Sequence, residues 1–438
     1  MRERRIPFAS EARIERLQRR RLRRIVHHAW ATVPFYRRTM RERDIGPGDL
    51  RSAADLERLP LLTGKLVRTR LREFRSTRIA DGATLKLQSS GSTDEGVRKL
   101  VLWDEESSLR KLAVLARHGA AMRRLAGAGW GSRRALLVPE EAFRPLVEFW
   151  GDRVAGWSGT TEMEWIPPDL PFPEIVQRLA DFRPTVVNSY GSITELFLGR
   201  AASRGLEWSP PRVWIYGGDA LPGYVRERFE ERFGFPIAST YQTSEAGSIG
   251  FECERRDGFH VNADQNVVRI VRPDGSASPP GETGEVVVSS LVNRATVILN
   301  FRLGDRAAWA AEPCPCGRTL PRIVGLEGRV SDIVRTADGR EISAAVLKNA
   351  LGEPLNRFAL QVQLLHPEVG EVVWRIVPFE DTDVDADRRE LLRATRTYLG
   401  NGTRVGVEVV EEMERSPGGK RVDVVHGDGG PRDEEVGG

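Results

Sequence analysis

The feature that most constrains the fold of this chain is an alternation of two hydrophobic patterns between Leu85 and Val324. Short apolar segments, each typical of a buried β-strand, are separated by stretches with the periodicity of an amphipathic helix. The apolar segments include RALLVP, PTVVNSY, RVWIYGG and FPIASTYQ, and Gly223–Phe233 is an example of the helical pattern. Strands that alternate with helices in this way predict an α/β fold.

The segments on either side of this region differ in pattern. The first 80 residues are predicted to be a helical lead-in, and a β pattern covers residues 284–299. Near the C-terminus the predicted order is strand (EVVWRIVPF), helix (Ala386–Leu399) and strand (TRVGVEVVEEM). We therefore predict a large N-terminal domain of mixed β-sheets and helices, a small α+β C-terminal domain and a disordered tail, at residues 1–330, 331–425 and 426–438.

Composition and charge exclude several classes of protein. With 40% hydrophobic and 29% charged residues, the 438-residue chain is neither disordered nor fibrous. No apolar run reaches the roughly 20 residues that span a bilayer, and the arginine-rich start predicts no secretory signal. A net charge of +4 is weak for a nucleic-acid-binding protein. The three cysteines cannot all pair, which favours a reducing, cytoplasmic location.

Six short motifs offer groups of the kind that bind nucleotides. Hydroxyls and backbone N–H groups of LQSSGSTDEGVRK (Leu87–Lys99) are suited to phosphate, and STYQTSEAG (Ser239–Gly247) combines an aromatic ring, a hydroxyl and a carboxylate. Each motif alone is also typical of an ordinary surface turn or ion pair. The other four are YGGDALP (Tyr216–Pro222), NFRLGD (Asn300–Asp305), GRVSD (Gly328–Asp332) and RSPGGKR (Arg415–Arg421).

The order of these motifs resembles the adenylate-forming superfamily of acyl–coenzyme A synthetases, and most closely its phenylacetate–coenzyme A ligase branch. The superfamily pattern runs from a phosphate loop through Y-G-x-[ST]-E, [YF]-[RK]-T-G-D and G-R-x-x-D to a late G-K, and all five recur here in that order. HAWATVPFY (28–36), DLERLPLLT (55–63) and CPCGRTLPR (314–322) also match the branch. The resemblance spans roughly residues 20–425 and implies that the C-terminal domain is mobile.

The resemblance implies a role for each matching residue. The residues expected to hold the β- and γ-phosphates are Ser89, Ser90, Gly91, Ser92 and Thr93. The expected adenine pocket consists of Gly217, Gly218 and Asp219, with Tyr241 stacked on the base. The remaining nucleotide and catalytic positions are Ser244 (α-phosphate), Glu245 (Mg²⁺), Asp305 and Arg329 (ribose), Asp332 (hinge) and Lys420 (substrate carboxylate and α-phosphate).

The implied activity is that of an AMP-forming acid–thiol ligase. The carboxylate of an aryl or arylacetic acid attacks the α-phosphate of ATP, and the acyl-adenylate then passes its acyl group to coenzyme A. ATP, Mg²⁺ and coenzyme A are the implied cofactors and cosubstrate, and a small-molecule acid is the partner, with no nucleic acid or membrane. The predicted walls of the acid pocket are Tyr190, Gly191, Tyr216, Ala246 and Gly247.

Two alternatives to this activity stay open. In one, adenylation is followed by transfer to an amine, a hydroxyl or a carrier protein in a biosynthetic pathway. In the other, the chain is a non-catalytic nucleotide-binding relative. The phosphate loop keeps this second alternative open, because Asp94 and Glu95 add negative charge where the superfamily has none, and Gln242 and Leu303 replace the usual glycine and threonine. Whether the chain forms a homodimer is also open.

A separate pattern of thiols and one imidazole predicts a metal site. Cys314 and Cys316 flank Pro315, and Cys253 and His260 lie on an earlier β segment. Together they form a Cys₃His set, which suits tetrahedral zinc and leaves no open coordination position. The sequence thus predicts a structural zinc. The competing interpretation is three unrelated, partly buried thiols and a surface histidine.

Overall fold

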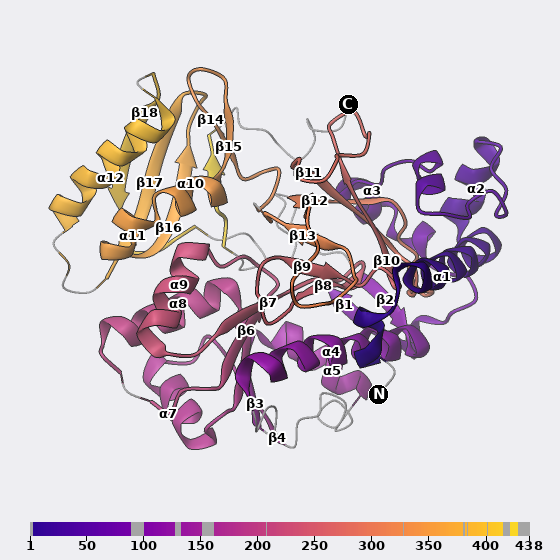
Figure 1. Cartoon of the computed structure of the whole chain (residues 1–438), viewed down its shortest axis with the longest axis horizontal. Helices are drawn as coiled ribbons and strands as arrows, with labels where there is room; N and C mark the ends of the chain where they lie inside the picture. The colour runs from indigo at the N-terminus through magenta and orange to yellow at the C-terminus, as the bar shows by residue number, and fades with distance from the viewer. Residues whose placement is uncertain are drawn as a thin grey trace.

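A single 11-stranded β-sheet runs through the larger part of the protein, in the strand order β10-β11-β12-β13-β9-β8-β7-β6-β5-β3-β4 (Figure 1). The structure is a computed structural model, and it describes residues 3–88, 100–127, 133–150, 162–206, 208–326, 328–379, 382, 384–400, 402–414 and 421–427. Within these residues, no helix is long and apolar enough to cross a membrane.

One half of the sheet is parallel and carries the predicted strand–helix alternation. Its strands are β3 (Arg133–Leu137), β4 (Glu162–Ile166), β5 (Val186–Tyr190), β6 (Val213–Gly217) and β7 (Ile237–Thr243). Its helices are α4 (Glu105–Ala126), α5 (Glu140–Trp150), α7 (Phe172–Phe182), α8 (Gly191–Ser203) and α9 (Gly223–Phe233). The α/β class predicted from the hydrophobic pattern is confirmed.

The other half of the sheet is antiparallel and begins where β8 folds back on β7. Its strands are β8 (Gly247–Glu252), β9 (Phe259–Val261), β10 (Asn266–Val271), β11 (Gly284–Ser290), β12 (Phe301–Trp309) and β13 (Arg322–Val324). The β pattern predicted for 284–299 is wrong beyond Ser290. The side chain of Asn293 accepts hydrogen bonds from the backbone N–H groups of Ala295 and Thr296, which turns the chain out of the strand direction.

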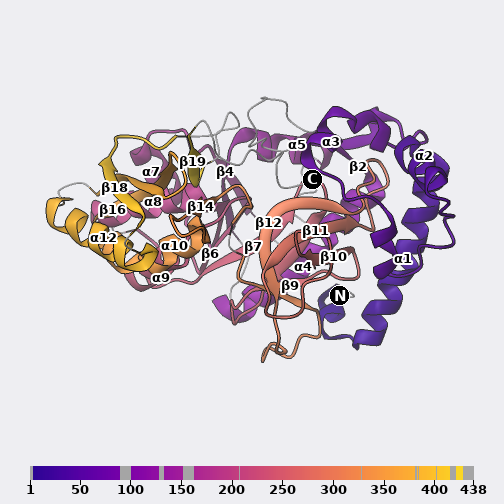
Figure 2. The ribbon, with the colours of Figure 1, turned by 90° about the horizontal axis from the view of Figure 1, so that it is seen from above.

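The N-terminal segments form the predicted helical lead-in, at the end of the molecule opposite the C-terminal unit (Figure 2). Leu22, Ile25, Val26 and Ala29 recur at helical spacing on α1, and all four are buried against the domain to which the helix belongs. The elements are η1 (Glu3–Phe8), α1 (Glu11–Thr32), α2 (Pro34–Glu42), η2 (Ala54–Arg58), α3 (Gly64–Thr69), η3 (Leu71–Phe74), η4 (Asp81–Ala83) and the hairpin strands β1 (Thr84–Gln88) and β2 (Leu100–Asp104).

Residues 333–426 build a smaller α+β unit around a four-stranded sheet of order β18-β17-β16-β19. The predicted helix 386–399 lies within α12, and the two predicted strands correspond to β17 and β18. We retain the predicted domain boundary near residue 330 as a proposal. The elements are β14 (Ile333–Arg335), β15 (Glu341–Ser343), α10 (Ala344–Ala350), α11 (Gly352–Phe358), β16 (Ala359–His366), β17 (Glu371–Pro378), α12 (Val384–Leu399), β18 (Arg404–Val409) and β19 (Val424–His426).

A buried ionic cluster ties the first helices to the sheet. The guanidinium of Arg117 on α4 donates to both carboxylate oxygens of Asp264, at 2.6 and 2.9 Å, and also contacts Glu3. Arg21 on α1 donates to the same aspartate at 2.6 Å. Burial alone would raise the pKa of Asp264, but the hydrogen bonds and charges of Arg117 and Arg21 hold it below its ordinary value. This one carboxylate therefore joins α1, α4 and the loop before β10.

We predict that Asp264→Asn lowers the free energy of unfolding at pH 7 by about 3 kcal/mol, because it leaves buried guanidinium groups without their carboxylate. The folded-state pKa of Asp264 is depressed, so its contribution is present above the unfolded pKa of about 3.9 and is lost as the pH falls below it. Urea unfolding between pH 3 and 7 should therefore show the difference between wild type and variant shrinking below about pH 4. Glu282→Gln, at an exposed ion pair with Arg272, is the control, and an equal effect there would contradict the prediction.

Candidate active site

The predicted adenine loop lies at the carboxyl end of β6, in the parallel half of the sheet. Gly217 ends the strand, and Gly218 follows it with a φ of 85°, a conformation that favours glycine. A Cβ on Gly218 would stand 3.0 Å from the ring of Tyr190, which ends the neighbouring strand β5. The loop therefore passes closely over Tyr190, one of the predicted acid-pocket residues.

Asp219, the third residue of this loop, is fixed by the start of α8. Its carboxylate accepts hydrogen bonds from the backbone N–H of Ser192 at 3.2 Å and from the Ser192 hydroxyl at 2.5 Å. A carboxylate at the first turn of a helix is favoured by the helix dipole. Ser192 was not among the predicted site residues, and it connects the adenine loop to Gly191.

The predicted base-stacking and ribose-binding residues lie together. The hydroxyl of Tyr241 on β7 donates to a carboxylate oxygen of Asp305 on β12 at 2.6 Å. Asp305 also forms a backbone β-bridge with Arg329. Burial, together with the negative charge of Asp305, raises the pKa of Tyr241 well above its ordinary value, so the phenol keeps its proton. The three residues predicted to contact the nucleoside therefore lie together.

Ser244 and Glu245 occupy the tight turn between β7 and β8. The indole N–H of Trp103 on β2 donates to the carbonyl oxygen of Ser244 at 2.9 Å, which holds the turn against the β1–β2 hairpin. The Ser244 hydroxyl lies 3.4 Å from a carboxylate oxygen of Glu245, which is itself buried. A β-bulge between Tyr241 and Gln242 shifts the register just before this turn.

Two residues beside this turn, Trp103 and Lys111, were missed by the sequence analysis. Gly247 has a φ of 72°, and a Cβ there would lie 3.0 Å from the ring of Trp103 and 3.5 Å from Cγ of Lys111. The ammonium of Lys111 lies 5.3 Å from the centre of the Trp103 ring, and burial lowers its pKa to about 8. The rarity of lysine in this chain, six of 66 basic residues, is the signal that could have drawn attention to Lys111.

Tyr216 lies near the end of β6, in register with Ser189 of β5, the residue before Tyr190. It lies in the hydrophobic cluster that packs against α9, whereas Ala246 and Tyr241 belong to the cluster that includes α1 and the antiparallel strands. Its hydroxyl is hydrogen-bonded to Ser239 and Arg226. The described residues therefore bring Tyr190, Gly191 and Tyr216 to the adenine loop and Gly247 to Trp103.

Asp332, the predicted hinge residue, lies immediately before β14. Its carboxylate accepts a hydrogen bond from the backbone N–H of Arg329 at 3.2 Å, and its carbonyl oxygen accepts one from Ala344 at 2.7 Å. Burial, and then the negative charge of Asp423, raise the pKa of Asp332 to about 6. The predicted phosphate-loop residues 89–93, with Asp94 and Glu95, and the predicted catalytic Lys420 lie outside the described residues.

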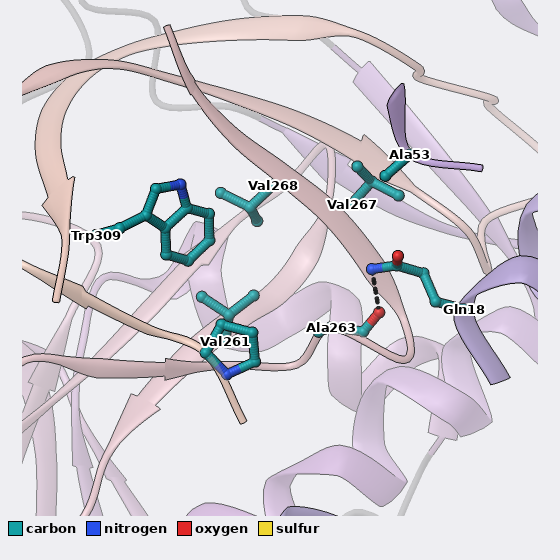
Figure 3. A pocket seen from close by; sticks show the side chains of 8 residues that line it. Gln18, Ala53, Val261, Ala263, Val267, Val268 and Trp309 are labelled. Atoms are coloured by element: carbon teal, nitrogen blue, oxygen red, sulfur yellow. Dashed lines mark hydrogen bonds between the residues drawn. The ribbon is translucent and has the colours of Figure 1, made fainter. Parts of the chain in front are cut away.

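A cavity of about 300 Å³ lies away from all of these residues, between α1 and the antiparallel half of the sheet (Figure 3). Its walls are mostly apolar, and the side-chain amide of Gln18 at its edge donates to the carbonyl oxygen of Ala263 at 2.7 Å. None of its lining residues has a predicted role. The others are Ala53, Val261, Val267, Val268, Trp309 and Pro321.

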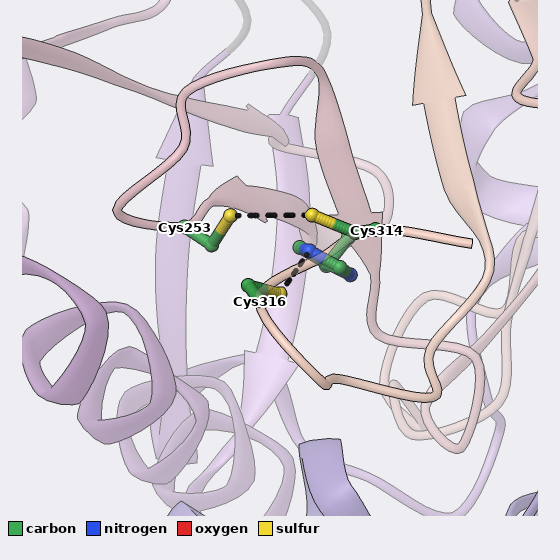
Figure 4. Close-up of side chains that lie close together, drawn as sticks. Cys253, Cys314 and Cys316 are labelled. Atoms are coloured by element: carbon green, nitrogen blue, oxygen red, sulfur yellow. Dashed lines mark hydrogen bonds between the residues drawn. The ribbon is translucent and has the colours of Figure 1, made fainter. Parts of the chain in front are cut away.

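The three cysteines and His260 meet as the sequence predicts (Figure 4). Their ligand atoms all lie within 4.8 Å of one another. The sulfur atoms of Cys253 and Cys314 are 3.8 Å apart, close to the roughly 3.8 Å that tetrahedral Zn–S bonds of about 2.3 Å require. Nε2 of His260 lies 3.3 Å from the sulfur of Cys316, and its Nδ1 lies 3.3 Å from the Leu320 carbonyl oxygen. Burial lowers the pKa of His260 to about 4, so the imidazole is neutral, as a metal ligand must be.

Curated proteins similar to this chain are phenylacetate–coenzyme A ligases. No protein-family model matches the chain. The chain is 26% identical over 440 residues to phenylacetate–coenzyme A ligase of Thermus thermophilus, covering 93% of this chain and 95% of that protein. The chain is phenylacetate–coenzyme A ligase-like and has the adenylate-forming fold.

Two solved structures of one ligase share the fold of this chain to different degrees. A crystal structure of 2-hydroxyisobutyryl-CoA ligase in the postadenylation state, in complex with R3-HIB-AMP, superposes with a TM-score of 0.80 at 19% identity, over 97% of this chain and 92% of that one. The same ligase in the thioesterification state gives a TM-score of 0.61 at 20% identity, over 97% and 91%. The chain therefore superposes better on the postadenylation structure of that ligase than on its thioesterification structure.

A structure of the amide bond synthetase McbA from Marinactinospora thermotolerans is more distant. It superposes with a TM-score of 0.55 at 18% identity, over 79% of this chain and 68% of that one. At this level of identity the match concerns the fold and not the reaction.

We predict that Tyr241→Phe lowers the free energy of unfolding by about 2 kcal/mol, because Asp305 loses a buried hydrogen-bond donor while the ring packing is kept. Chemical denaturation of the two proteins measures the difference. Tyr398→Phe, at an exposed position on α12, is the matched control and should change little. Equal stability of wild type and Tyr241→Phe would show that the hydrogen bond does not form in solution.

Proposed function

We propose that the chain activates an aryl or arylacetic acid with ATP and transfers the acyl group to coenzyme A. The observation that carries this proposal is the meeting of Tyr241, Asp305 and Arg329 beside the glycine loop 217–218, each at the position where the adenylate-forming pattern expects a nucleotide contact. The full-length similarity to a phenylacetate–coenzyme A ligase supports the same reaction and the same class of acid.

In this proposal the nucleoside binds at the carboxyl ends of the parallel strands. The ring of Tyr241 stacks on adenine, and the carboxylate of Asp305 and the guanidinium of Arg329 hold the ribose hydroxyls. The backbone of Gly217 and Gly218 allows a flat base to approach closely. The buried carboxylate of Glu245 is a hard oxygen ligand suited to Mg²⁺, which would neutralise charge on the phosphates.

In the first step the protein forms no covalent bond to the substrates, and it acts by positioning them and stabilising charge. A carboxylate oxygen of the acid forms a bond to the α-phosphorus, and pyrophosphate leaves with the electrons of the broken P–O bond. Negative charge grows on the phosphoryl oxygens, where the Ser244 hydroxyl and the Lys420 ammonium would stabilise it. The thiol of coenzyme A next attacks the acyl carbonyl, and AMP leaves.

The acceptor of the second step has an alternative of a different class. McbA, which shares the fold, is an amide bond synthetase, so an amine acceptor is compatible with this architecture. A carrier protein or a hydroxyl would require the same first step. Assays that supply coenzyme A, an amine or a carrier protein to the preformed acyl-adenylate separate these acceptors.

The Cys₃His cluster forms a second, structural site in the same proposal. The residues Cys253, His260, Cys314 and Cys316 would hold one zinc ion and use all of its coordination positions. The ion would join the loop after β8, strand β9 and the loop before β13, so its contribution is to folding. Thiolate ligands of this kind would require a reducing compartment, in line with the predicted cytoplasmic location.

We predict that the purified protein exchanges pyrophosphate into ATP in the presence of an aryl or arylacetic acid. Lys420→Ala should slow acyl-adenylate formation about 100-fold, the cost of removing a preorganised charge at a developing anion. Transfer from a chemically prepared acyl-adenylate to coenzyme A should keep nearly the wild-type rate. The absence of acid-dependent exchange over a broad panel of carboxylic acids would refute the enzymatic proposal.

For the thiol cluster we predict about one zinc per chain in elemental analysis of protein prepared without chelator. Removing the metal, or changing Cys316 to Ser, should lower the melting temperature before it alters substrate affinity, because the four ligands join segments of the chain and are not among the predicted nucleotide-binding residues. A metal-free protein with the stability of the wild type would contradict the assignment.

A further inference from the structure

The small C-terminal unit packs tightly on the parallel half of the large domain. Helix α8 contacts β16, and α9 contacts α11 (Figures 1 and 2). A Cβ on Gly199 of α8 would fall 2.3 Å from a methyl group of Leu360, so no side chain larger than hydrogen fits there without movement. One hydrophobic cluster continues from the strands of the large domain into the small sheet. The surface between the two units is therefore a close-packed interface.

Charged groups cross the same interface and are buried in it. The guanidinium of Arg421 forms an ion pair with the carboxylate of Glu195 on α8 and donates a hydrogen bond to the carbonyl oxygen of Ala220 at 3.2 Å. The two side chains are only 6% and 2% exposed. The cost of desolvating both charges offsets much of their attraction, so such a pair adds little net stability. The loss of one partner is nevertheless costly, because the other charge stays buried.

A second carboxylate, that of Asp423 in the small unit, also contacts Arg421. The Nε atom of Arg421 lies 3.1 Å from a carboxylate oxygen of Asp423, and the Lys348 ammonium on α10 lies 2.5 Å from that same oxygen. Burial raises the pKa of Glu195, and the charge of Arg421 opposes this rise. Arg421 is thus held by Asp423 within its own unit and presents its remaining donors to Glu195 and Ala220 in the large domain.

The position of this contact in the sequence links it to the proposed chemistry. Arg421 directly follows Lys420, and Ala220 directly follows Asp219 of the predicted adenine loop. An anchor at Arg421 therefore fixes the chain next to the predicted catalytic lysine against the loop next to the predicted adenine pocket. The arrangement of the two domains also matches the postadenylation structure of 2-hydroxyisobutyryl-CoA ligase better than its thioesterification structure.

We propose that Glu195 and Arg421 form an interdomain latch that holds the small domain in the adenylating orientation and thereby positions Lys420. Both are positioning residues, because they act through the chain segment that carries the lysine. The expected effect of the latch on catalysis rests on the proposed function. Its expected effect on the orientation of the small domain does not depend on that function. Rotation of the small domain for the second step must break the contacts of Arg421 with Glu195 and Ala220, while those with Asp423 travel with the domain.

The test compares Arg421→Gln, Glu195→Gln and the double variant in the two half-reactions and in small-angle X-ray scattering. Arg421→Gln leaves Glu195 buried without its cation, so adenylate formation should slow about tenfold or more, and the scattering profile should shift to a more extended shape. Transfer from a prepared acyl-adenylate should not slow. The double variant should recover part of the lost adenylation, because the stranded carboxylate is gone.

The control is Arg404→Gln, which removes an exposed ion pair with Glu368 and Glu371 inside the small unit and should leave both half-reactions and the scattering unchanged. If Arg421→Gln does not fold, Arg421→Lys gives the same comparison, because an ammonium lacks the planar fork that reaches Glu195, Ala220 and Asp423 together. Equal losses in both half-reactions, or an unchanged scattering profile, would overturn the latch. A wild type without acid-dependent exchange would refute the proposed function, and scattering would still decide the latch.

Discussion

The antiparallel pairing of β7 with β8 is the constraint on which the candidate site depends. It ends the parallel half of the sheet, pairs Thr243 with Gly247 and leaves Ser244 and Glu245 in the turn between the strands. The bulge at Tyr241 and Gln242 increases the local twist. From this position the Tyr241 phenol reaches Asp305 on β12, a strand of the antiparallel half. The carboxyl end of the parallel strand β7 and the side chain of Asp305 on the antiparallel strand β12 therefore meet because both strands belong to one continuous sheet.

Arginines carry several of the buried positive charges in the part of the chain that the structure describes. Arg117, Arg226 and Arg421 each make more than one contact with a buried carboxylate or its neighbours, at Asp264, Glu252 and Glu195 respectively. The planar guanidinium offers five donors in fixed directions, so one side chain can satisfy several acceptors and set their geometry. Desolvation offsets much of the attraction within such a pair, so removing one partner costs more than the intact pair contributes.

The sequence predicted those features that depend on local pattern. Apolar periodicity identified α12 and the strands of the parallel half, since the spacing of apolar residues records which face is buried. The thiol cluster was also predictable, because a chain with three cysteines and a suitably spaced histidine offers few other sets of ligands. The strand predicted through residue 299 was wrong, because hydrogen bonds to the Asn293 side chain competed with the ladder.

The α/β class, the order of the nucleotide motifs and the composition of the thiol cluster can all be inferred from the amino-acid sequence. The contacts between distant residues depend on the folded arrangement: the Lys111 side chain beside Gly247, the Tyr241 hydroxyl on Asp305, and Arg421 on Glu195, 226 residues away. The physical reason is that hydrophobic spacing specifies the buried face of each element, whereas strand order, register and domain packing specify what lies opposite that face. Strand order, register and domain packing depend on the free energy of the whole chain, so the sequence of any one segment does not reveal them.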